Sequence, residues 1–581
     1  MPLDSPPRPR CAFRVAAIGH RWDQLDAAHA GVIGERFQEI LVATGAVATD
    51  LATTPEAGFD GDTPRLTLLS GLAEGTDRIA ALAALNIGGW QLHAVAPFAL
   101  ERYEQDFTLA TSLHEFRRLW RAAGARTVLD GHAGEFDAYA PLSRTLVDFS
   151  DLLIVVWNGE RGRGPGGTAA SVEIARVEDV PIIRIDPDQP RSCWLEDLAA
   201  DDHGRSRGLA GLDDRLRSLL APPPPVANDE DNRHHDMRAE YFAERIAIDT
   251  TAGRTTWASN WRGMPPEVAN AVLGHFAEAH QWADQLANAY ARRFRRTFTT
   301  IFVLAPLAVV AAYLGAIEFA GSIARLSAVG IVEMAILATI SWMVARGRRR
   351  RLRERWLDYR ALAERLRHLS VLWPLGRSTP MVRVPPPGIR NDARLSWVGW
   401  LLRCTAREAG LAEVDCTPAY AEQCRDLLRN AEIAPQRSFH SGKVTRSAQH
   451  HHALAAAAER LFLGALFFAA IHLLLGILPA KWPAASRDRR MVELLLAGFC
   501  VALPAMAASI HGYLGIGDFA GVAVRSAGIE PRLAQIEARL LRLDPVDVTA
   551  VGELATEATA LMETELVTWR TVAETRVLET P

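Results

Sequence analysis

Cysteine is scarce in this chain, with six residues among 581. None of the six forms a C-x-x-C pair, and none has histidine partners at the spacing of a zinc site. The pattern therefore excludes a zinc framework, and we expect free, reduced thiols and no metal site.

A strong net charge and a signal peptide are also missing. The formal net charge is −4, which gives no reason to expect a nucleic-acid partner. Residues 1–10 are rich in proline and arginine and lack the apolar stretch of about 7–15 residues that a signal peptide needs. We therefore expect the N-terminal part to stay in the cytoplasm.

Long apolar runs are present, in two pairs. They lie near residues 298–317 and 326–345, and again near 461–478 and 492–513. Each run holds about 18–22 residues, which at about 1.5 Å per residue covers the roughly 30 Å of a bilayer core. The runs predict two membrane hairpins, and hence a multi-pass protein of the inner (plasma) membrane.

The first part of the chain has the pattern of an α/β domain. Short apolar runs alternate with helical patterns, and the strand candidates are residues 14–18, 65–69, 92–96, 127–129, 152–157 and 181–185. This alternation predicts a parallel sheet with helices on both faces, with ligands bound at the carboxyl ends of the strands. The expected fold class is therefore α/β, followed by an α-helical membrane domain with about four transmembrane helices.

Composition suggests three parts. Residues 1–220 are enough to bury a core of their own and form the expected sensing domain. A proline run followed by polar residues predicts a linker over 221–265. Residues 266–581 form the expected helical membrane domain, with hairpins near 298–345 and 461–513.

Three glycine-containing turns follow predicted strands. Glycine turns that open helices expose N–H groups beside a positive helix end, an arrangement that suits phosphate. The candidate ligand-binding residues are Gly19, His20, Arg21, Ser70, Gly71, Glu74, Gly75, Asp77, Arg78, Asn158, Gly164, Gly166, Gly167 and Thr168. Two alternatives remain open: plain tight turns, and an Arg21 side chain that pairs with Asp151 or Glu74.

Three strings carry a family resemblance. SGLAEGTDRIAALAAL (70–85), the HAVAPF…Y…DF stretch (93–107) and GRGPGGTAASVEIA (162–175) resemble the SLOG superfamily, which groups the Smf/DprA proteins with the Lonely Guy (LOG) nucleotide phosphoribohydrolases. The resemblance covers about residues 12–190. It implies a Rossmann-like fold that binds a nucleotide or nucleotide-derived signal, such as a cyclic-nucleotide-like messenger, with no further cofactor. By that resemblance the pocket is lined by Gly71, Glu74, Gly75, Asp77, Arg78, Gly166, Gly167 and Thr168.

One departure from the family concerns catalysis. The LOG hydrolases carry P-G-G-x-G-T-x-x-E, with glutamate three residues past threonine, whereas Glu173 lies five past Thr168. Two extra helical residues rotate a side chain by about 200°. Glu173 is therefore predicted to point away from the ribose, and it could equally be a solvated helix residue. If the chain were a hydrolase, Arg78 and Glu173 would be the catalytic candidates.

Arginines flank the first hairpin on one side. Four lie within residues 292–296 and seven within 346–355, whereas the connection at 315–325 holds one. The positive-inside rule places both ends of this hairpin in the cytoplasm and implies contact with anionic lipid. The alternative, a nucleic-acid patch, fits less well beside apolar runs of this length.

The segment after the first hairpin carries a second resemblance. The pattern W-x-x-Y-R-x-x-A-E-x-L-R at 356–367 is similar to SLATT domains, two-transmembrane modules that accompany SLOG and nucleotide-cyclase-like sensors in bacterial conflict systems. Residues 519–529 and the last helix around Trp569 and Arg570 also resemble the end of that family. The coverage is about 270–575.

The second hairpin conflicts with the charge rule. Its connection at 479–490 holds Lys481, Arg487, Arg489 and Arg490 against Asp488, although it should face outward if both hairpins share an orientation. The second hairpin could be inverted, or it could be only weakly inserted. The third interpretation, which we favour, is that the first hairpin dominates and the charge bias of the second is overruled.

Two ionisable residues fall inside the apolar runs. Glu333 and His472 would be costly to expose to lipid, so they should face a bundle interior or a water-filled cavity. For Glu333 the alternatives are pore lining and a structural hydrogen bond between helices.

These features favour a sensor coupled to an effector. The chain would bind a nucleotide-derived messenger and respond by perturbing or permeabilising the membrane, as a homo-oligomer, in bacterial antiphage signalling. The alternative is a membrane-tethered phosphoribohydrolase of the LOG type, and a third class is a constitutive channel.

Reporter fusions test the predicted topology. Fusions after Arg296, Arg355 and Asp518 should report a cytoplasmic location, whereas fusions within 316–323 should report the outside, because eleven arginines hold one side of the hairpin in the cytoplasm. An outside signal after Arg355 would contradict the orientation. A mixed or inward signal near residue 486 would support a weakly inserted second hairpin.

Overall fold

The computed structural model describes residues 4–132, 134, 137–160, 164, 166–196, 209, 211–223, 233–245, 257–316, 323–378, 396–477 and 487–575. It divides into two compact units, and each is assembled from three segments of the chain. The first comprises Met1–Asp284, Ala361–Ile433 and Ile536–Ala560, and the second comprises Gln285–Arg360, Ala434–Gln535 and Leu561–Pro581.

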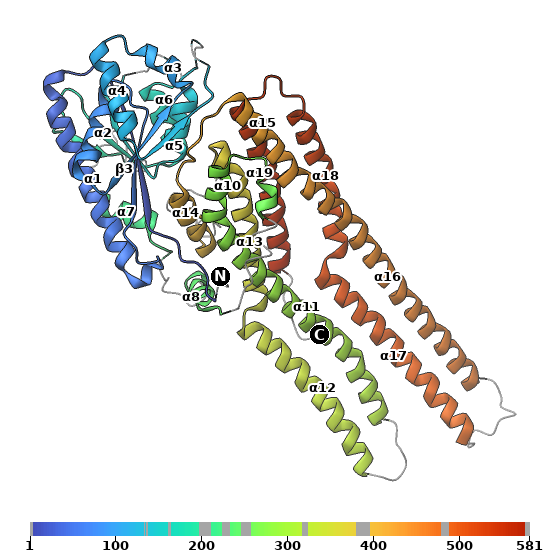
Figure 1. Ribbon diagram of the computed structural model, residues 1–581. Helices are drawn as coiled ribbons and strands as arrows, with labels where there is room; N and C mark the ends of the chain where they lie inside the picture. Colours follow the sequence, from blue (N-terminus) through green and yellow to red (C-terminus); the bar gives the residue numbers. More distant parts are fainter. Residues whose placement is uncertain are drawn as a thin grey trace. The chain divides into compact units, whose positions relative to one another are not determined.

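A seven-stranded sheet forms the centre of the first unit (Figure 1). The strands are β1 (Ala12–Gly19), β2 (Arg65–Ser70), β3 (Trp90–Ala96), β4 (Ala125–Val128), β5 (Leu152–Val156), β6 (Ile182–Ile185) and β7 (Cys193–Leu195). Their order is β4-β3-β2-β1-β5-β6-β7, and only β7 is antiparallel to its neighbour. The predicted parallel sheet is confirmed. Strand β7 was not predicted because three residues are too few to show a pattern.

Helices cover both faces of the sheet. They are α1 (Ala30–Thr53), α2 (Thr76–Ile87), α3 (Leu100–Tyr103), α4 (Ala110–Ala122), α5 (Ala140–Asp148), α6 (Thr168–Val177) and α7 (Leu212–Leu220). Figure 1 shows α1 and α2 on one side of the sheet and α5 and α6 on the other. Leu142 and Leu146 of α5 and Val172 of α6 pack in one core with Ala16 and Val155 of the strands. The apolar runs of the sequence thus bury themselves as the α/β pattern predicts.

The first unit is larger than the expected 1–220 domain, because later segments pack into it. It also contains α8 (Arg233–Ala243), α10 (Pro266–Val272), α14 (Trp397–Ala409) and α15 (Pro418–Leu427). Helix α8 lies inside the expected 221–265 linker, and residues 224–232 and 246–256 of that linker lie outside the described residues.

A buried ionic cluster ties α14 to the sheet. Arg14 Nε and Arg407 Nε lie 3.1 and 2.8 Å from the two carboxylate oxygens of Asp151. Burial alone would raise the pKa of Asp151, but the two guanidinium groups lower it to about 2. Asp151 thus forms ion pairs with Arg14 and Arg407. The alternative pairing of Arg21 with Asp151 is not formed in the structure.

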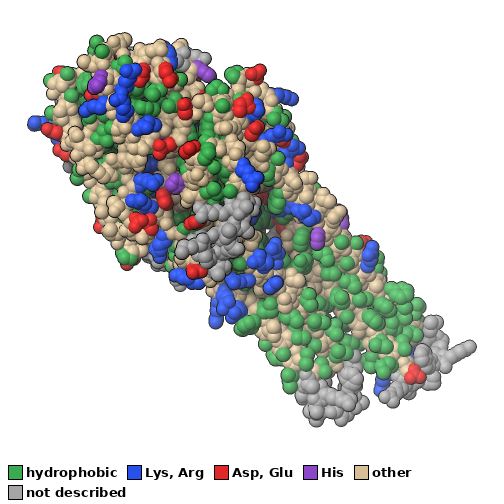
Figure 2. All heavy atoms as spheres, viewed as in Figure 1, with side chains coloured by type: hydrophobic (Ala, Val, Ile, Leu, Met, Phe, Trp, Pro, Cys, Tyr) green, Lys and Arg blue, Asp and Glu red, His purple; other side chains and the backbone are tan. Residues whose placement is uncertain are grey.

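The second unit holds the apolar helices. Its long helices are α11 (Glu278–Ala316), α12 (Ile323–Arg349), α13 (Leu352–Leu372), α16 (Ala434–Ile477), α17 (Arg487–Gly517), α18 (Phe519–Leu540) and α19 (Val548–Thr575), of which α11, α13, α18 and α19 also supply residues to the first unit. Within the described residues, four helices are long and apolar enough to cross a membrane, and at most 22% of each apolar window is buried. Hydrophobic side chains cover the surface of these spans (Figure 2). By their length and composition, these four helices indicate a membrane protein.

The two hairpins share one orientation. Ser509 Oγ of α17 donates to the Phe302 carbonyl of α11, and Tyr313 of α11 donates to the Leu494 carbonyl at 2.6 Å. Residue numbers rise along α11 while they fall along α17, so these helices are antiparallel. Because α16 and α17 pack as a hairpin, α16 runs parallel to α11. An inverted second hairpin is therefore not present in this bundle.

Arg489 is neutralised within the second hairpin. Its Nε lies 2.9 Å from Glu493, its Nη2 donates to the Leu475 carbonyl near the end of α16 at 3.1 Å, and its side chain is only 14% exposed. A cation that binds the last carbonyls of a helix is favourable there. One of the arginines that oppose an outward connection is thus already compensated. Lys481 lies outside the described residues.

Glu333 and His472 are half-buried in α12 and α16. Glu333 lies on the same stripe of α12 as Ile336 and Ile340, which pack against Ile301 of α11. Neither ionisable side chain has a hydrogen-bond or ion-pair partner among the described residues. Of the two alternatives for Glu333, the structural hydrogen bond between helices therefore has no partner within the described residues.

Substitution of Gly512 tests the contact between the hairpins. A Cβ at Gly512 would lie 2.4 Å from the ring of Phe302, whereas a Cβ at Gly515 would meet nothing within 4 Å. Gly512→Val should destabilise the detergent-solubilised protein by about 1–3 kcal/mol, as overpacked sites do. Gly515→Val controls for helix propensity. Equal melting temperatures of the two variants would contradict this packing.

Candidate functional site

A cavity of about 600 Å³ opens at the carboxyl ends of β1 and β5. These two strands are neighbours, and Gly19 at the end of β1 is paired with Val156 at the end of β5. The lining residues that had been predicted as ligand-binding are Gly19, His20, Arg21, Glu74, Asp77, Gly164, Gly166, Gly167 and Thr168. The structure therefore brings all three predicted turns to one cavity.

The loop after β1 is fixed to α2 through its backbone. Thr76 donates to the His20 carbonyl from both its backbone N–H (3.2 Å) and its Oγ1 (3.0 Å). A Cβ at Gly19 would lie 2.5 Å from Thr76 Oγ1, so only glycine permits this approach. The backbone N–H of Asn158 donates to His20 Nε2 at 3.3 Å, which leaves the proton of the neutral ring on Nδ1. His20 thus joins the turns after β1 and β5.

The turn before α6 offers backbone N–H groups to the cavity. Gly167 is the N-cap residue of α6 and has no side chain that could cap it. The first N–H groups of an α-helix have no partner within the helix, and the helix dipole places partial positive charge there. Gly166 has a φ of +87°, and a Cβ there would lie 2.5 Å from the Tyr139 carbonyl carbon. The glycines therefore permit close backbone packing, and the N–H groups at the start of α6 have the chemistry that suits an anion.

Arg21 supplies a cation to the same cavity. Its guanidinium lies 5.8 Å from the centre of the Tyr139 ring. Neither carboxylate considered from the sequence holds it, because Asp151 binds Arg14 and Arg407, and Glu74 accepts a hydrogen bond from Ser112 Oγ. Arg21 and the start of α6 together suit a phosphate group.

Asp77 is the buried acid of the cavity. Burial raises the pKa of its carboxyl group from 3.8 to about 7, although Arg21, Arg78 and the backbone N–H groups of Ala73 and Gly71 oppose this rise. Asp77 therefore exchanges a proton near neutral pH, inside the cavity.

Arg78 is buried, but it does not line the cavity. Its Nε donates to the Leu72 carbonyl at 3.1 Å, its Nη1 lies 3.1 Å from Glu115, and its guanidinium stacks 4.6 Å from the Phe107 ring centre. These contacts commit Arg78 to holding α2 and α4 around the loop at 71–75.

Four other predicted residues form the frame behind the cavity. Ser70 Oγ donates to the Asp77 carbonyl at 3.2 Å, and the Gly71 carbonyl accepts from Tyr103 at 2.9 Å. Gly75 has a φ of +87°, and a Cβ there would lie 2.6 Å from the His20 carbonyl oxygen. With Asn158, these residues position the loops and do not line the cavity.

Glu173 lies away from the cavity. Its side chain is 68% exposed and pairs with Arg176 at 2.7 Å, one turn further along α6. This position is the one that the five-residue spacing from Thr168 predicts.

Several aromatic lining residues were not among the predicted site residues. Trp22, Tyr103, Tyr139 and Trp157 all line the cavity, and Trp22 is 41% exposed. Burial and a hydrogen bond to Asp106 raise the pKa of Tyr139 to about 12, so its phenol stays neutral. Tyr103 falls within the motif at 93–107, whereas Tyr139 follows no strand or glycine turn and gave no signal.

Comparison with known protein families found a match for one segment of the chain. Residues 278–377 match the model of a family described as "Protein of unknown function (DUF4231)". This stretch contains α11, α12 and α13, and hence the first hairpin. No curated protein matches the chain.

The pH dependence of stability tests the state of Asp77. Folding raises the pKa of Asp77, so between about pH 4 and 7 the folded state keeps a proton that the unfolded state has lost. The free energy of unfolding therefore falls as pH rises through this window. Asp77→Asn removes the charge, and its stability relative to wild type should rise by about 2–3 kcal/mol between pH 5 and 8.

Thermal melts of the full-length protein across this pH range measure the difference. Asp214→Asn, at an exposed position in the first turn of α7, is the control for loss of one carboxylate. A constant difference between Asp77→Asn and wild type would contradict the raised pKa.

Proposed function

We propose that this chain is a membrane-anchored sensor for a nucleotide-derived messenger. The messenger binds in the cavity at the ends of β1 and β5, and the four spans respond by perturbing or permeabilising the bilayer. The observation that carries the proposal is the meeting of Arg21 and the glycine turn of α6 at one cavity.

The cavity chemistry supports a phosphate-bearing aromatic ligand. The start of α6 and Arg21 provide N–H groups and a positive charge for phosphate. Trp22, Tyr139 and Trp157 provide aromatic faces against which a base can stack. The resemblance of residues 12–190 to the SLOG superfamily points to the same class of ligand.

The membrane half supports an effector role. Residues 356–367 resemble SLATT domains and lie within the segment that matches the DUF4231 family model. The arginines beside the first hairpin suit anionic lipid, and the largely exposed spans suit assembly into a homo-oligomer within the bilayer. Under this proposal the sheet unit is cytoplasmic, and the protein serves bacterial antiphage signalling.

Hydrolysis of the N-glycosidic bond is the second candidate function, and one observation favours it. Neither Arg78 nor Glu173 lines the cavity, but Asp77 does, and its pKa of about 7 suits an acid or base at neutral pH. Release of free base from AMP, lost in Asp77→Asn, would support the hydrolase.

Gly167→Asp tests the phosphate position. A Cβ at Gly167 lies 3.4 Å from the Gly164 carbonyl oxygen and meets nothing closer, and the backbone there (φ −82°, ψ 171°) suits an aspartate N-cap. The variant should therefore fold, while its carboxylate occupies the N–H groups that phosphate would use. Gly167→Ala, which adds the same Cβ without charge, is the matched control.

Thermal shift of the full-length protein with a panel of nucleotides, starting with AMP, measures binding, because a ligand of the folded state raises the melting temperature. We expect at least one nucleotide to raise the melting temperature of wild type and Gly167→Ala but not of Gly167→Asp. In liposomes that nucleotide should release trapped dye through wild type only. An unchanged shift in Gly167→Asp would move the site elsewhere, and dye release without any nucleotide would favour a constitutive channel.

A further inference from the structure

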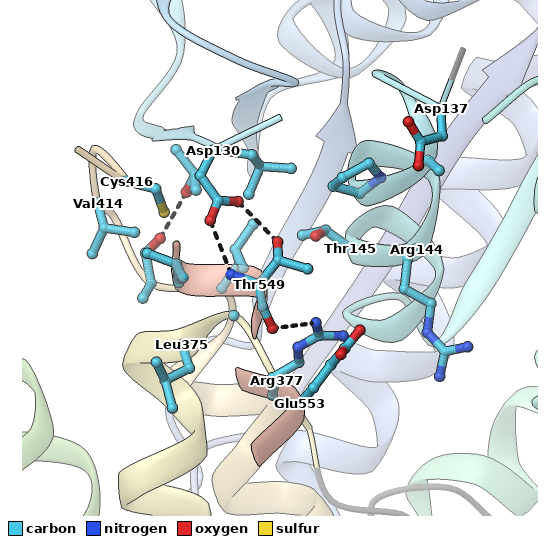
Figure 3. A pocket seen from close by; sticks show the side chains of 18 residues that line it. Asp130, Asp137, Arg144, Thr145, Leu375, Arg377, Val414, Cys416, Thr549 and Glu553 are labelled. Carbon is cyan, nitrogen blue, oxygen red and sulfur yellow. Dashed lines mark hydrogen bonds between the residues drawn. The ribbon is translucent and has the colours of Figure 1, made fainter. Parts of the chain in front are cut away.

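A second cavity, of about 380 Å³, lies against α5 in the same compact unit (Figure 3). Its walls come from the end of β4, from α5, from the chain around residues 411–416, and from the first turns of α19. The segments that meet there are far apart in the sequence.

Helix α5 is the common wall of the two cavities. Leu142, Ser143 and Leu146 line the cavity at the ends of β1 and β5, whereas Arg144 and Thr145 line the second cavity. Residues three or four apart share a face of a helix, so the two sets are two faces of one short helix. A shift of α5 therefore changes both cavities together.

The start of α5 rests on the glycine turn of α6. Ser143 Oγ donates to the Gly166 carbonyl at 2.8 Å. The backbone of Gly166 approaches that of Tyr139 and Ala140 so closely that an added Cβ would lie within 2.7 Å of both. Because the two backbones are in close contact, a displacement of the turn has to displace α5 as well.

In the second cavity, Asp130 holds the first turn of α19. The backbone N–H and the hydroxyl of Thr549 each donate to one carboxylate oxygen of Asp130 at 2.9 Å. Arg377 Nη2 donates to the Thr549 carbonyl at 3.2 Å, and Figure 3 shows both contacts side by side. A carboxylate at this position stabilises a helix start through hydrogen bonds and the helix dipole.

The segment that carries Asp130 is fixed to the sheet. Leu129 N–H donates to the Ala96 carbonyl at 2.9 Å, and Gly131 N–H donates to the Pro97 carbonyl at 3.0 Å. Asp130 also lines the second cavity together with Arg144 and Thr145 of α5. The anchored end of β4 and helix α5 therefore meet at this cavity.

We propose that the Asp130–Thr549 contact is the output of the candidate nucleotide site. The state of the glycine turn of α6 passes through α5, which lines the second cavity together with Asp130 and Thr549, to the first turn of α19. Helix α19 supplies residues to both compact units, so the hold on its first turn acts on a helix that the membrane unit shares. This inference rests on the proposed function for its input ligand, but the coupling itself is testable without ligand.

Hydrogen exchange of the full-length protein in detergent tests the coupling. Ser143→Ala removes the bond to Gly166 and touches no residue of α19. Under the proposal, amides of residues 549–552 exchange about threefold faster or more in this variant, because the two sites share a coupling free energy. Ser218→Ala, whose hydroxyl donates to the Arg215 carbonyl of α7, is the matched control and leaves these amides unchanged.

The reciprocal variant completes the test, since coupling acts in both directions. Thr549→Val removes one bond to Asp130 and should speed exchange within residues 139–146, whereas Thr556→Val, whose hydroxyl bonds the Gly552 carbonyl of the same helix, should not. Effects of Ser143→Ala that stop at α5 and α6 would overturn the proposal, as would equal exchange in the two threonine variants. If no nucleotide raised the melting temperature, the proposed ligand would be wrong, but the hydrogen-exchange result would still decide whether the two sites are coupled.

Discussion

The candidate site depends on one close backbone approach, between the loop after β1 and the first turn of α2. Two donors of Thr76 converge on the His20 carbonyl, and neither Gly19 nor Gly75 leaves room for a Cβ at that point. This contact brings the loop that carries Arg21 over the ends of β1 and β5. A side chain at either glycine would push the loop outward and open the cavity, so the two glycines set the geometry that the lining residues require.

Much of the fold was predictable because its signals are local. Six of the seven strands appear as short apolar runs, and parallel pairing places the turns that follow them at one edge of the sheet. Helix periodicity also placed Glu173 away from the cavity. By contrast, Tyr139 and the Asp130–Thr549 contact depend on the arrival of distant segments, which no local pattern encodes. The same holds for residues 361–433, which pack into the sheet unit through buried groups such as Arg407.

The membrane helices show where counting charges falls short. The positive-inside rule weighs every arginine of a connection alike. In the second hairpin, Arg489 forms an ion pair with Glu493 and donates a hydrogen bond to the last turn of α16. Its charge is therefore compensated within the protein. The shared direction of the hairpins then follows from packing: Tyr313 and Phe302 fix α17 against α11, and Gly512 provides the space for the ring.

The division of the chain bears on how a signal could travel. The two compact units separate within α11, α13, α18 and α19, and continuous helices therefore supply residues to both. A hydrogen-bonded helix transmits a displacement better than a flexible linker does, because its backbone has no free dihedral angles to absorb the motion. Among these helices, α19 has its first turn held by a carboxylate from the end of a sheet strand. Binding energy can change the state of such a helix only if the ligand favours one arrangement of α5 over another. A ligand bound at the start of α6 would act next to α5, because the backbone of Gly166 lies in direct contact with Tyr139 and Ala140 at the start of that helix.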